Sequence, residues 1–178
     1  MSAEYKFNVS EIKQYIPLLK AGDEVFLSGT VYTARDAAHK RIVSLIESGC
    51  PLPFHLDGAV IYYAGPTPEK QGRPIGSCGP TTSTRMDVFS PLLLDNGLIG
   101  MIGKGERKKP VIDSIVKNGA VYFCAIGGAG ALAAKCITSC EVIAFPELGC
   151  ESVKRLEICD FPLVVGIDSK GNSVFPNH

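Results

Sequence analysis

A run of hydroxyls followed by a cation is the segment of this sequence best suited to binding a small anion. Gly79 and Pro80 bend the chain, four hydroxyl residues follow, and Arg85 comes next. A helix that begins here would offer free backbone N–H groups to an anion, and the Arg85 guanidinium would add a bidentate contact to a carboxylate or phosphate. An ordinary threonine-capped helix start is the alternative interpretation.

Two more cations follow predicted strands. Arg35 comes directly after an apolar strand, and Lys104 lies between two glycines after the apolar run L-I-G-M-I. Ligands of open α/β sheets gather at the carboxyl ends of strands, and glycines let a ligand approach the backbone closely. Helix capping by Thr33 or Asp36 beside a surface arginine is the alternative for the first segment. His39, inside that helix, is expected to be packed or solvated and not a ligand.

Arg35, Arg85 and Lys104 together describe a site for a small dianion. The sequence supplies no obvious strong base and no metal-ligand set beside them. A lone threonine hydroxyl is too weakly acidic to act as a base unless a neighbouring charge tunes it. The residues therefore predict half of an active site.

A glycine-rich segment offers a competing function. Gly128, Gly130 and Ala133 satisfy G-x-G-x-x-A after a predicted strand, and Glu147 lies about 20 residues further on, as in a dinucleotide-binding fingerprint. The chain after Glu147 is too short for the second half of a dinucleotide-binding fold. A helix start that holds one carboxylate, or simple close packing, is favoured over a nicotinamide or flavin site.

The seven cysteines favour reduced, packed thiols. Their number is odd and no C-x-x-C pair occurs, so neither a disulfide framework nor a metal site is predicted. The amino-terminal residues lack the pattern of a signal peptide, and no apolar run reaches the roughly 18 residues that span a bilayer. We expect a cytoplasmic protein with no membrane contact.

Charge balance argues against nucleic acid as a partner. The 18 basic residues equal the 18 acidic ones, whereas nucleic-acid binders carry a basic excess that neutralises phosphates. The short run Arg107-Lys108-Lys109 is interpreted as a solvated helix start. A small molecule or another protein is the expected partner.

Apolar, β-branched runs alternate with helix-like segments along the 178 residues. Strands are expected over residues 24–32, 59–64, 98–102, 121–126, 142–145, 163–167 and 173–175. Helices are expected over 36–48, over 81–95 with a break at Pro91, near 109–117 and shortly after Gly128. The alternation predicts an α/β fold with a mixed, partly parallel sheet and antiparallel strands at the end. One domain over residues 1–178 is expected.

Five sequence blocks, in order from about residue 20 to the end, resemble one family. The chain resembles the β subunit, or C-terminal half, of the class I iron–sulfur fumarate hydratases and L-tartrate dehydratases. Any one block would be weak, but five in the same order are specific. The blocks are T-A-R-D-A-A-H-K-R, G-P-T-T-S-T-R-M-D, G-K-G, G-G-A-G-A-L-A and E-L-G-C-E-S-V-K-R-L-E-I-C-D-F-P.

The resemblance implies a swivelling β/β/α domain and the reversible hydration of fumarate to L-malate, a tricarboxylic acid cycle reaction. It assigns Arg35, Arg85 and Lys104 to the substrate carboxylates. It makes Thr81 the catalytic base, working with an aspartate of the α subunit. A four-iron four-sulfur cluster is expected on three cysteines of that α subunit, with its open iron as Lewis acid, and none of this chain's cysteines is a predicted ligand. The resemblance also implies a hetero-oligomer such as α2β2, which would be inactive without its α subunit.

The resemblance leaves the substrate open between fumarate and tartrate. Thr84 stands where many relatives carry a smaller residue, which would change the pocket. The E-L-G…D-F-P tail and D-A-A-H-K-R favour fumarate. The remaining alternative is a non-catalytic module that binds a small dicarboxylate or nucleotide through the same cations.

Overall fold

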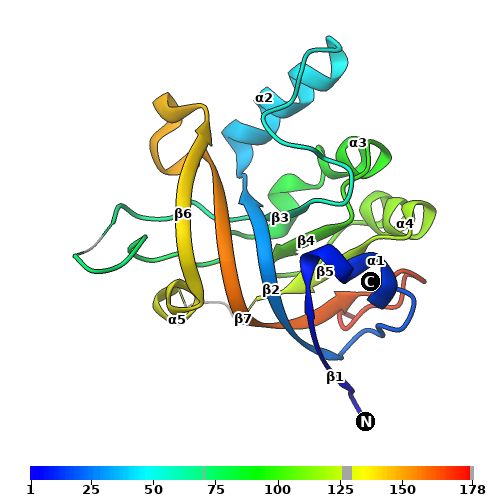
Figure 1. The fold of residues 1–178 in the computed structure, drawn as a ribbon. Helices are drawn as coiled ribbons and strands as arrows, with labels where there is room; N and C mark the ends of the chain where they lie inside the picture. Colours follow the sequence, from blue (N-terminus) through cyan, green and yellow to red (C-terminus); the bar gives the residue numbers. More distant parts are fainter. Residues whose placement is uncertain (70, 126–129, 177–178) are drawn as a thin grey trace.

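The computed structural model describes residues 1–69, 71–125 and 130–176, which form a mixed sheet with helices packed against it (Figure 1). The strands are β1 (Glu4–Asn8), β2 (Glu24–Thr33), β3 (Val60–Tyr62), β4 (Gly100–Gly103), β5 (Val121–Cys124), β6 (Ile137–Ala144) and β7 (Val153–Ile167). The α-helices are α1 (Ile12–Tyr15), α2 (Asp36–Glu47), α3 (Ser90–Asp95), α4 (Lys109–Asn118) and α5 (Gly130–Lys135). Three 3-10 helices are η1 (Val9–Glu11), η2 (Ser83–Met86) and η3 (Pro146–Glu151).

Strands β2, β3, β4, β5 and β7 pair in a closed cycle. The sheet order is β1-β2-β3-β4-β5-β7-β6, and β7 pairs with β2 as well. Strands β2 to β5 are parallel neighbours, whereas β7 runs antiparallel to β2, β5 and β6. The predicted α/β class with a mixed, partly parallel sheet and an antiparallel end is therefore confirmed.

The central strands are buried on both faces because successive side chains point to opposite sides of a sheet. In β3, Val60 and Tyr62 enter one apolar cluster, and Ile61 with the following Tyr63 enters the other. The second cluster also takes residues from α2, α3 and α4, which lie on one side of the sheet (Figure 1). This arrangement explains why the central strands appear in the sequence as nearly continuous apolar runs.

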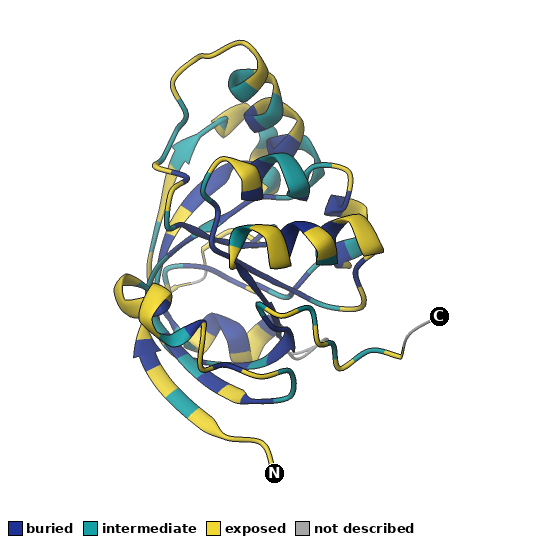
Figure 2. Cartoon of the chain, turned by 90° about the vertical axis from the view of Figure 1, so that its right-hand side faces the viewer, coloured by how far each residue is buried: buried dark blue, intermediate teal, exposed yellow. Residues whose placement is uncertain are grey.

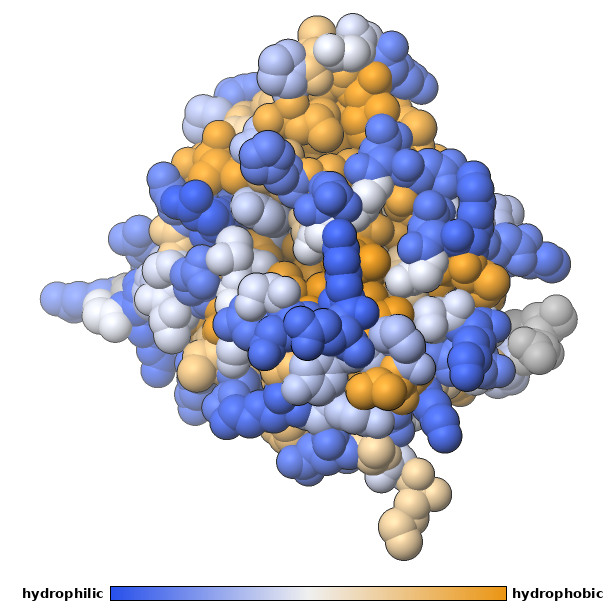
Figure 3. Space-filling view, turned by 45° about the vertical axis from the view of Figure 1, so that its right-hand side comes forward, coloured by the Kyte–Doolittle hydropathy of each residue, from blue (hydrophilic) through white to orange (hydrophobic). Residues whose placement is uncertain are grey.

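The helices have one apolar face and one polar face. In α4, Val111 and Ile115 are buried, while Lys109, Asp113 and Lys117 are exposed (Figure 2). Hydrophilic side chains prevail on the face in Figure 3, with apolar patches between them. Within the described ranges, no helix is long and apolar enough to cross a membrane.

Several element boundaries differ from the sequence prediction. Strand β1 was not expected. Strand β6 begins at Ile137, five residues before the expected start at Val142, and β7 begins at Val153, ten residues before the expected start at Leu163. Residues 173–175 form no strand, but Ser173 makes an isolated bridge to Ile167.

The β7 start was missed because charged residues at 154, 155 and 157 interrupt it, so it lacks the continuous apolar run that marks the central strands. The helical segment after residue 81 does form two pieces, but Pro91 lies in the first turn of α3 and does not break it. Arg35, and neither Thr33 nor Asp36, is the N-cap of α2, and its side chain makes no capping hydrogen bond.

Candidate active site

Two of the four predicted site residues follow the carboxyl ends of parallel strands in the same sheet. Arg35 follows β2, and Lys104 follows β4 directly. Between these two strands lies β3, and the chain that leaves it at Tyr63 pairs with the segment before η2. Open α/β sheets bind ligands at this edge because the loops that leave neighbouring strands converge there.

Backbone hydrogen bonds attach the threonine segment to the sheet. The Thr81 N–H donates to the Tyr63 carbonyl at 2.7 Å, and the Ser83 N–H donates to the Lys104 carbonyl at 2.9 Å. Thr82 and Lys104 also form an isolated parallel bridge. These N–H groups are therefore occupied, and the prediction that this helix start offers them freely to an anion is wrong for Thr81 and Ser83. At these two residues only the side chains remain available to a ligand.

Arg85 is anchored to the start of α2. Its Nη2 donates to Asp36 Oδ2 at 2.7 Å, and the side chains are 51% and 28% exposed. A guanidinium has five N–H donors, so one bond to Asp36 leaves others for a ligand. This ion pair brings Arg85 to the residue that follows Arg35.

Arg35 is half-buried against the turn after β3. A Cβ added to Gly65 would lie 2.9 Å from Arg35 Nη1 and 3.1 Å from the Cys150 carbonyl oxygen, so only glycine leaves room for the guanidinium. Arg35 Nε is buried, and it has no hydrogen-bond partner among the described residues. An unpaired buried donor is costly, so it is suited to an incoming acceptor.

Lys104 and Thr81 are both half-buried. In the part of the chain that the structure describes, the Lys104 ammonium forms no ion pair. Cavities of about 560 and 430 Å³ lie beside Thr84 and beside Cys150, and neither is lined by Arg35, Thr81 or Lys104. Arg85 is absent from both linings as well, so none of the four predicted residues lines either of these cavities.

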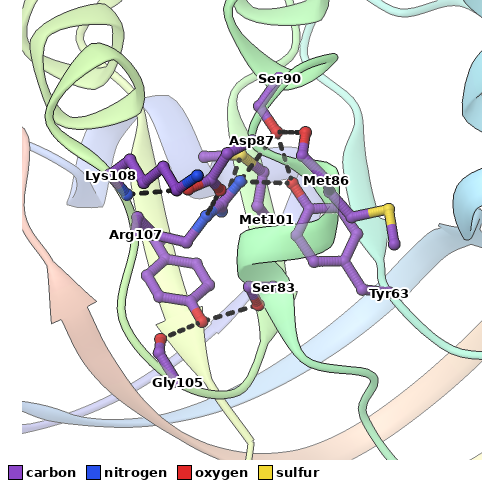
Figure 4. A network of polar contacts seen from close by, with 10 residues as sticks. Tyr63, Ser83, Met86, Asp87, Ser90, Met101, Gly105, Arg107 and Lys108 are labelled. Carbon is purple, nitrogen blue, oxygen red and sulfur yellow. Dashed lines mark hydrogen bonds and ion pairs between the residues drawn. The ribbon is translucent and has the colours of Figure 1, made fainter.

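A buried polar network contacts the end of the threonine segment, and the sequence analysis did not predict it. Arg107 pairs with Asp87, and both side chains are almost fully buried (Figure 4). The interpretation of residues 107–109 as a solvated helix start is therefore wrong for Arg107, although Lys109 does begin α4 and is exposed. No spacing rule joins residues 87 and 107, so only the tertiary fold reveals the pair.

His39 is packed, as expected. Its Nδ1 lies 2.8 Å from the Arg35 carbonyl oxygen, which can only accept, so Nδ1 carries the hydrogen. The ring lies against Tyr63 and Phe89. Burial is the main cause that lowers the pKa of His39 to about 4, and the positive charge of Arg107 adds to it.

Gly130, the described glycine of the G-x-G-x-x-A pattern, packs closely against the loop before Thr81. Gly128 lies outside the described residues, so the full dinucleotide pattern has no structural description. Gly130 begins α5, and a Cβ there would lie 2.3 Å from Ser77 Oγ and 3.1 Å from the Gly79 nitrogen. The close-packing interpretation thus accounts for Gly130.

Comparison with known proteins identifies the family of this chain. The family described as Fumarase C-terminus matches residues 2–178. The chain belongs to this family. Family membership confirms the resemblance that the five sequence blocks indicated.

Three relatives show what share of their own length this chain matches. The chain is 38% identical to fumarate hydratase 2 of Leishmania major over 98% of its own length and 31% of that relative. It is 39% identical to the anaerobic class I fumarate hydratase of Escherichia coli strain K12, over 94% of this chain and 31% of that relative. It is 40% identical to a protein named as the L(+)-tartrate dehydratase beta subunit of Methanocaldococcus jannaschii, over 97% of this chain and 91% of that relative. The chain thus spans about a third of the fumarate hydratases and most of the beta subunit.

The thiols of this chain do not fit the iron–sulfur cluster that the resemblance implies. Such clusters are held by closely grouped thiolates. Over residues 1–69, 71–125 and 130–176, no three His, Cys, Asp or Glu side chains gather where they could hold a metal. Burial raises the pKa of Cys78 to about 12 and that of Cys124 to about 11, which favours the protonated thiols.

Proposed function

We propose that this chain is the β subunit of an iron–sulfur hydro-lyase that reversibly hydrates fumarate to L-malate. The proposal is supported by two contacts of the threonine segment: Arg85 pairs with Asp36, the residue after Arg35, and the Ser83 N–H donates to the Lys104 carbonyl. The names of the relatives, two fumarate hydratases and a tartrate dehydratase beta subunit, support the same reaction class.

The three cations suit a substrate with two carboxylates. Arginine forms planar bidentate contacts with a carboxylate, and lysine supplies a point charge. Removal of a proton beside a carboxylate builds up negative charge, and cations fixed in advance stabilise that charge. In this proposal Arg35 and Arg85 orient the substrate, and Lys104 stabilises the growing charge.

Thr81 is the proposed base for the proton next to the carboxylate. Its backbone N–H donates to the Tyr63 carbonyl, which fixes the backbone that carries this hydroxyl to the end of β3. A threonine hydroxyl needs a neighbouring charge to accept a proton. We propose that a carboxylate of an α subunit supplies that help and that the cluster is also held by α, since the described thiols of this chain do not fit it.

An anaerobic pull-down with this chain as bait tests the proposal. The expected result is a co-eluting α subunit with bound iron and sulfide, together with fumarate hydration that is lost in air. Tartrate dehydration by the same complex, with no fumarate hydration, would replace the substrate but keep the reaction class. A complex without either activity, or a chain that elutes alone and is stabilised by dicarboxylates, would favour the binding-module alternative.

Variants of the purified complex test the residues. Thr81→Ala and Arg85→Ala should each abolish turnover without unfolding the chain, because neither side chain is buried in the core. Thr81→Ser keeps the hydroxyl and should retain part of the activity. Normal turnover in the two alanine variants would refute the site.

A further inference from the structure

The network behind the site centres on one ion pair. The side chains of Arg107 and Asp87 are 0% and 5% exposed, and Arg107 Nε donates to Asp87 Oδ1 at 2.6 Å. Asp87 Oδ2 accepts from the backbone N–H of Lys108 at 2.8 Å. Because buried charges are costly unless they are paired and hydrogen-bonded, the two side chains are confined to this arrangement.

Hydrogen-bond directions through the network are fixed. Arg107 Nη2 donates to Ser90 Oγ at 2.8 Å and to Tyr63 Oη at 3.2 Å. The Ser90 hydroxyl donates to the Met86 carbonyl at 2.9 Å, so Tyr63 must donate to Ser90 across their 3.1 Å contact. The network thereby links η2 and α3 to the loop after β4 (Figure 4).

Tyr122 on β5, which is fully buried, links the same two segments. Its hydroxyl lies 2.8 Å from Ser83 Oγ and 2.8 Å from the Gly105 carbonyl oxygen. A carbonyl only accepts and a tyrosine has one hydroxyl hydrogen, so Tyr122 donates to Gly105 and Ser83 donates to Tyr122. The Arg107 guanidinium lies 4.8 Å from the centre of the Tyr122 ring, which adds a cation–π contact.

We infer that Arg107, together with Asp87 and Tyr122, positions the carboxylate clamp. Arg85 lies between Ser83 and Asp87, both anchored by the network, and Lys104 directly precedes the anchored Gly105. The network therefore sets the distance between the two cations. The inference rests on the proposed function, because it assigns Arg85 and Lys104 to the substrate.

Arg107 acts through these segments and not on the substrate. Its side chain is fully buried, and its Nε and Nη2 donate to Asp87, Ser90 and Tyr63. Misplacement of a binding group by about 1 Å can cost about a hundredfold in rate. Loss of the anchors should therefore weaken substrate binding even where the chain remains folded.

Tyr122→Phe tests the inference with the smallest change, in the complete αβ complex. Loss of the bridging hydroxyl should raise the KM for fumarate by roughly tenfold, with kcat changed by less than about threefold. Backbone amides of residues 81–87 and 103–108 should exchange hydrogen roughly tenfold faster, and distant segments should not change. Unchanged KM and unchanged exchange would overturn the inference.

Three further variants separate positioning from folding. Tyr5→Phe removes an exposed hydroxyl, 3.4 Å from the Leu18 carbonyl, and should match the wild type in both measurements. Arg107→Lys keeps a charge for Asp87 but lacks the planar fork, so it should fold better than Arg107→Met while its KM stays raised. A wild-type KM in Arg107→Lys would refute the role of the fork. If the wild-type complex hydrates no substrate, the proposed function fails, whereas hydrogen exchange still decides whether the network holds the two segments.

Discussion

Arg85 Nη2 donates to Asp36 Oδ2 at 2.7 Å, and this contact joins the threonine segment to the first residue of α2. The pair brings together two blocks of sequence, around residues 35 and 85, that have no local connection. Because both side chains are partly exposed, the pair contributes less than about 1 kcal/mol to stability. Its main consequence is the orientation of the Arg85 guanidinium.

Asp36→Ala and Asp36→Asn therefore form a matched pair. Both remove a negative charge from the start of α2 and lose a similar helix-dipole contribution, about 0.5 kcal/mol. Only asparagine keeps an oxygen that accepts from Arg85, so KM should rise roughly tenfold in the alanine variant and less in the asparagine variant. Steady-state kinetics of the αβ complex and thermal unfolding check this; equal KM values would contradict the orienting role.

The sequence was sufficient for the α/β class, the central strands and the family, but not for β1 or for the support of the site. Buried strands such as β3 and amphipathic helices such as α4 follow from apolar periodicity, which is a local property. A local stretch of sequence predicts that the Arg107 side chain is exposed because it is charged. Its burial is possible only because Asp87, distant in sequence, pairs with it. Similarly, the N–H groups of the threonine segment seemed free until their carbonyl partners on neighbouring loops were known.

Close approach of Gly103 to η2 gives a second prediction. A Cβ on Gly103 would lie 1.9 Å from Ser83 Oγ and 2.9 Å from Tyr63 Cδ2. Gly103→Ala should therefore displace Ser83 and lower the free energy of unfolding by about 1–3 kcal/mol. Urea unfolding of this variant should be compared with that of Gly79→Ala, whose added Cβ would be 3.5 Å from Gly130 Cα, an ordinary contact. Equal stabilities would refute the steric argument.

Buried His39 predicts a stability that falls in mild acid. Burial lowers its pKa from 6.5 to about 4 in the folded chain, so the unfolded chain binds the extra proton between these values. The folded state therefore keeps its full stability above pH 6.5 and loses about 3 kcal/mol as the pH falls to 4.

Urea unfolding at several pH values measures this loss. His39→Gln removes the titrating group and should flatten the dependence on pH between 6.5 and 4. A slope that persists unchanged in His39→Gln would show that other groups cause it. Asp36 opposes the shift by favouring the charged imidazole, so Asp36→Asn should steepen the loss slightly.

The Arg107–Asp87 pair predicts strong coupling in a double-mutant cycle. Arg107→Met leaves the Asp87 carboxylate buried without its cation and should cost about 3–5 kcal/mol. Asp87→Asn keeps an oxygen for the Lys108 N–H but leaves the Arg107 charge uncompensated. The double variant buries neither charge, so its loss of stability should be smaller than the sum of the two single losses, by about 1–3 kcal/mol. Denaturant unfolding of the four proteins measures this coupling. Additive losses would mean that the pair is not energetically linked and that the aromatic rings around the guanidinium stabilise it instead.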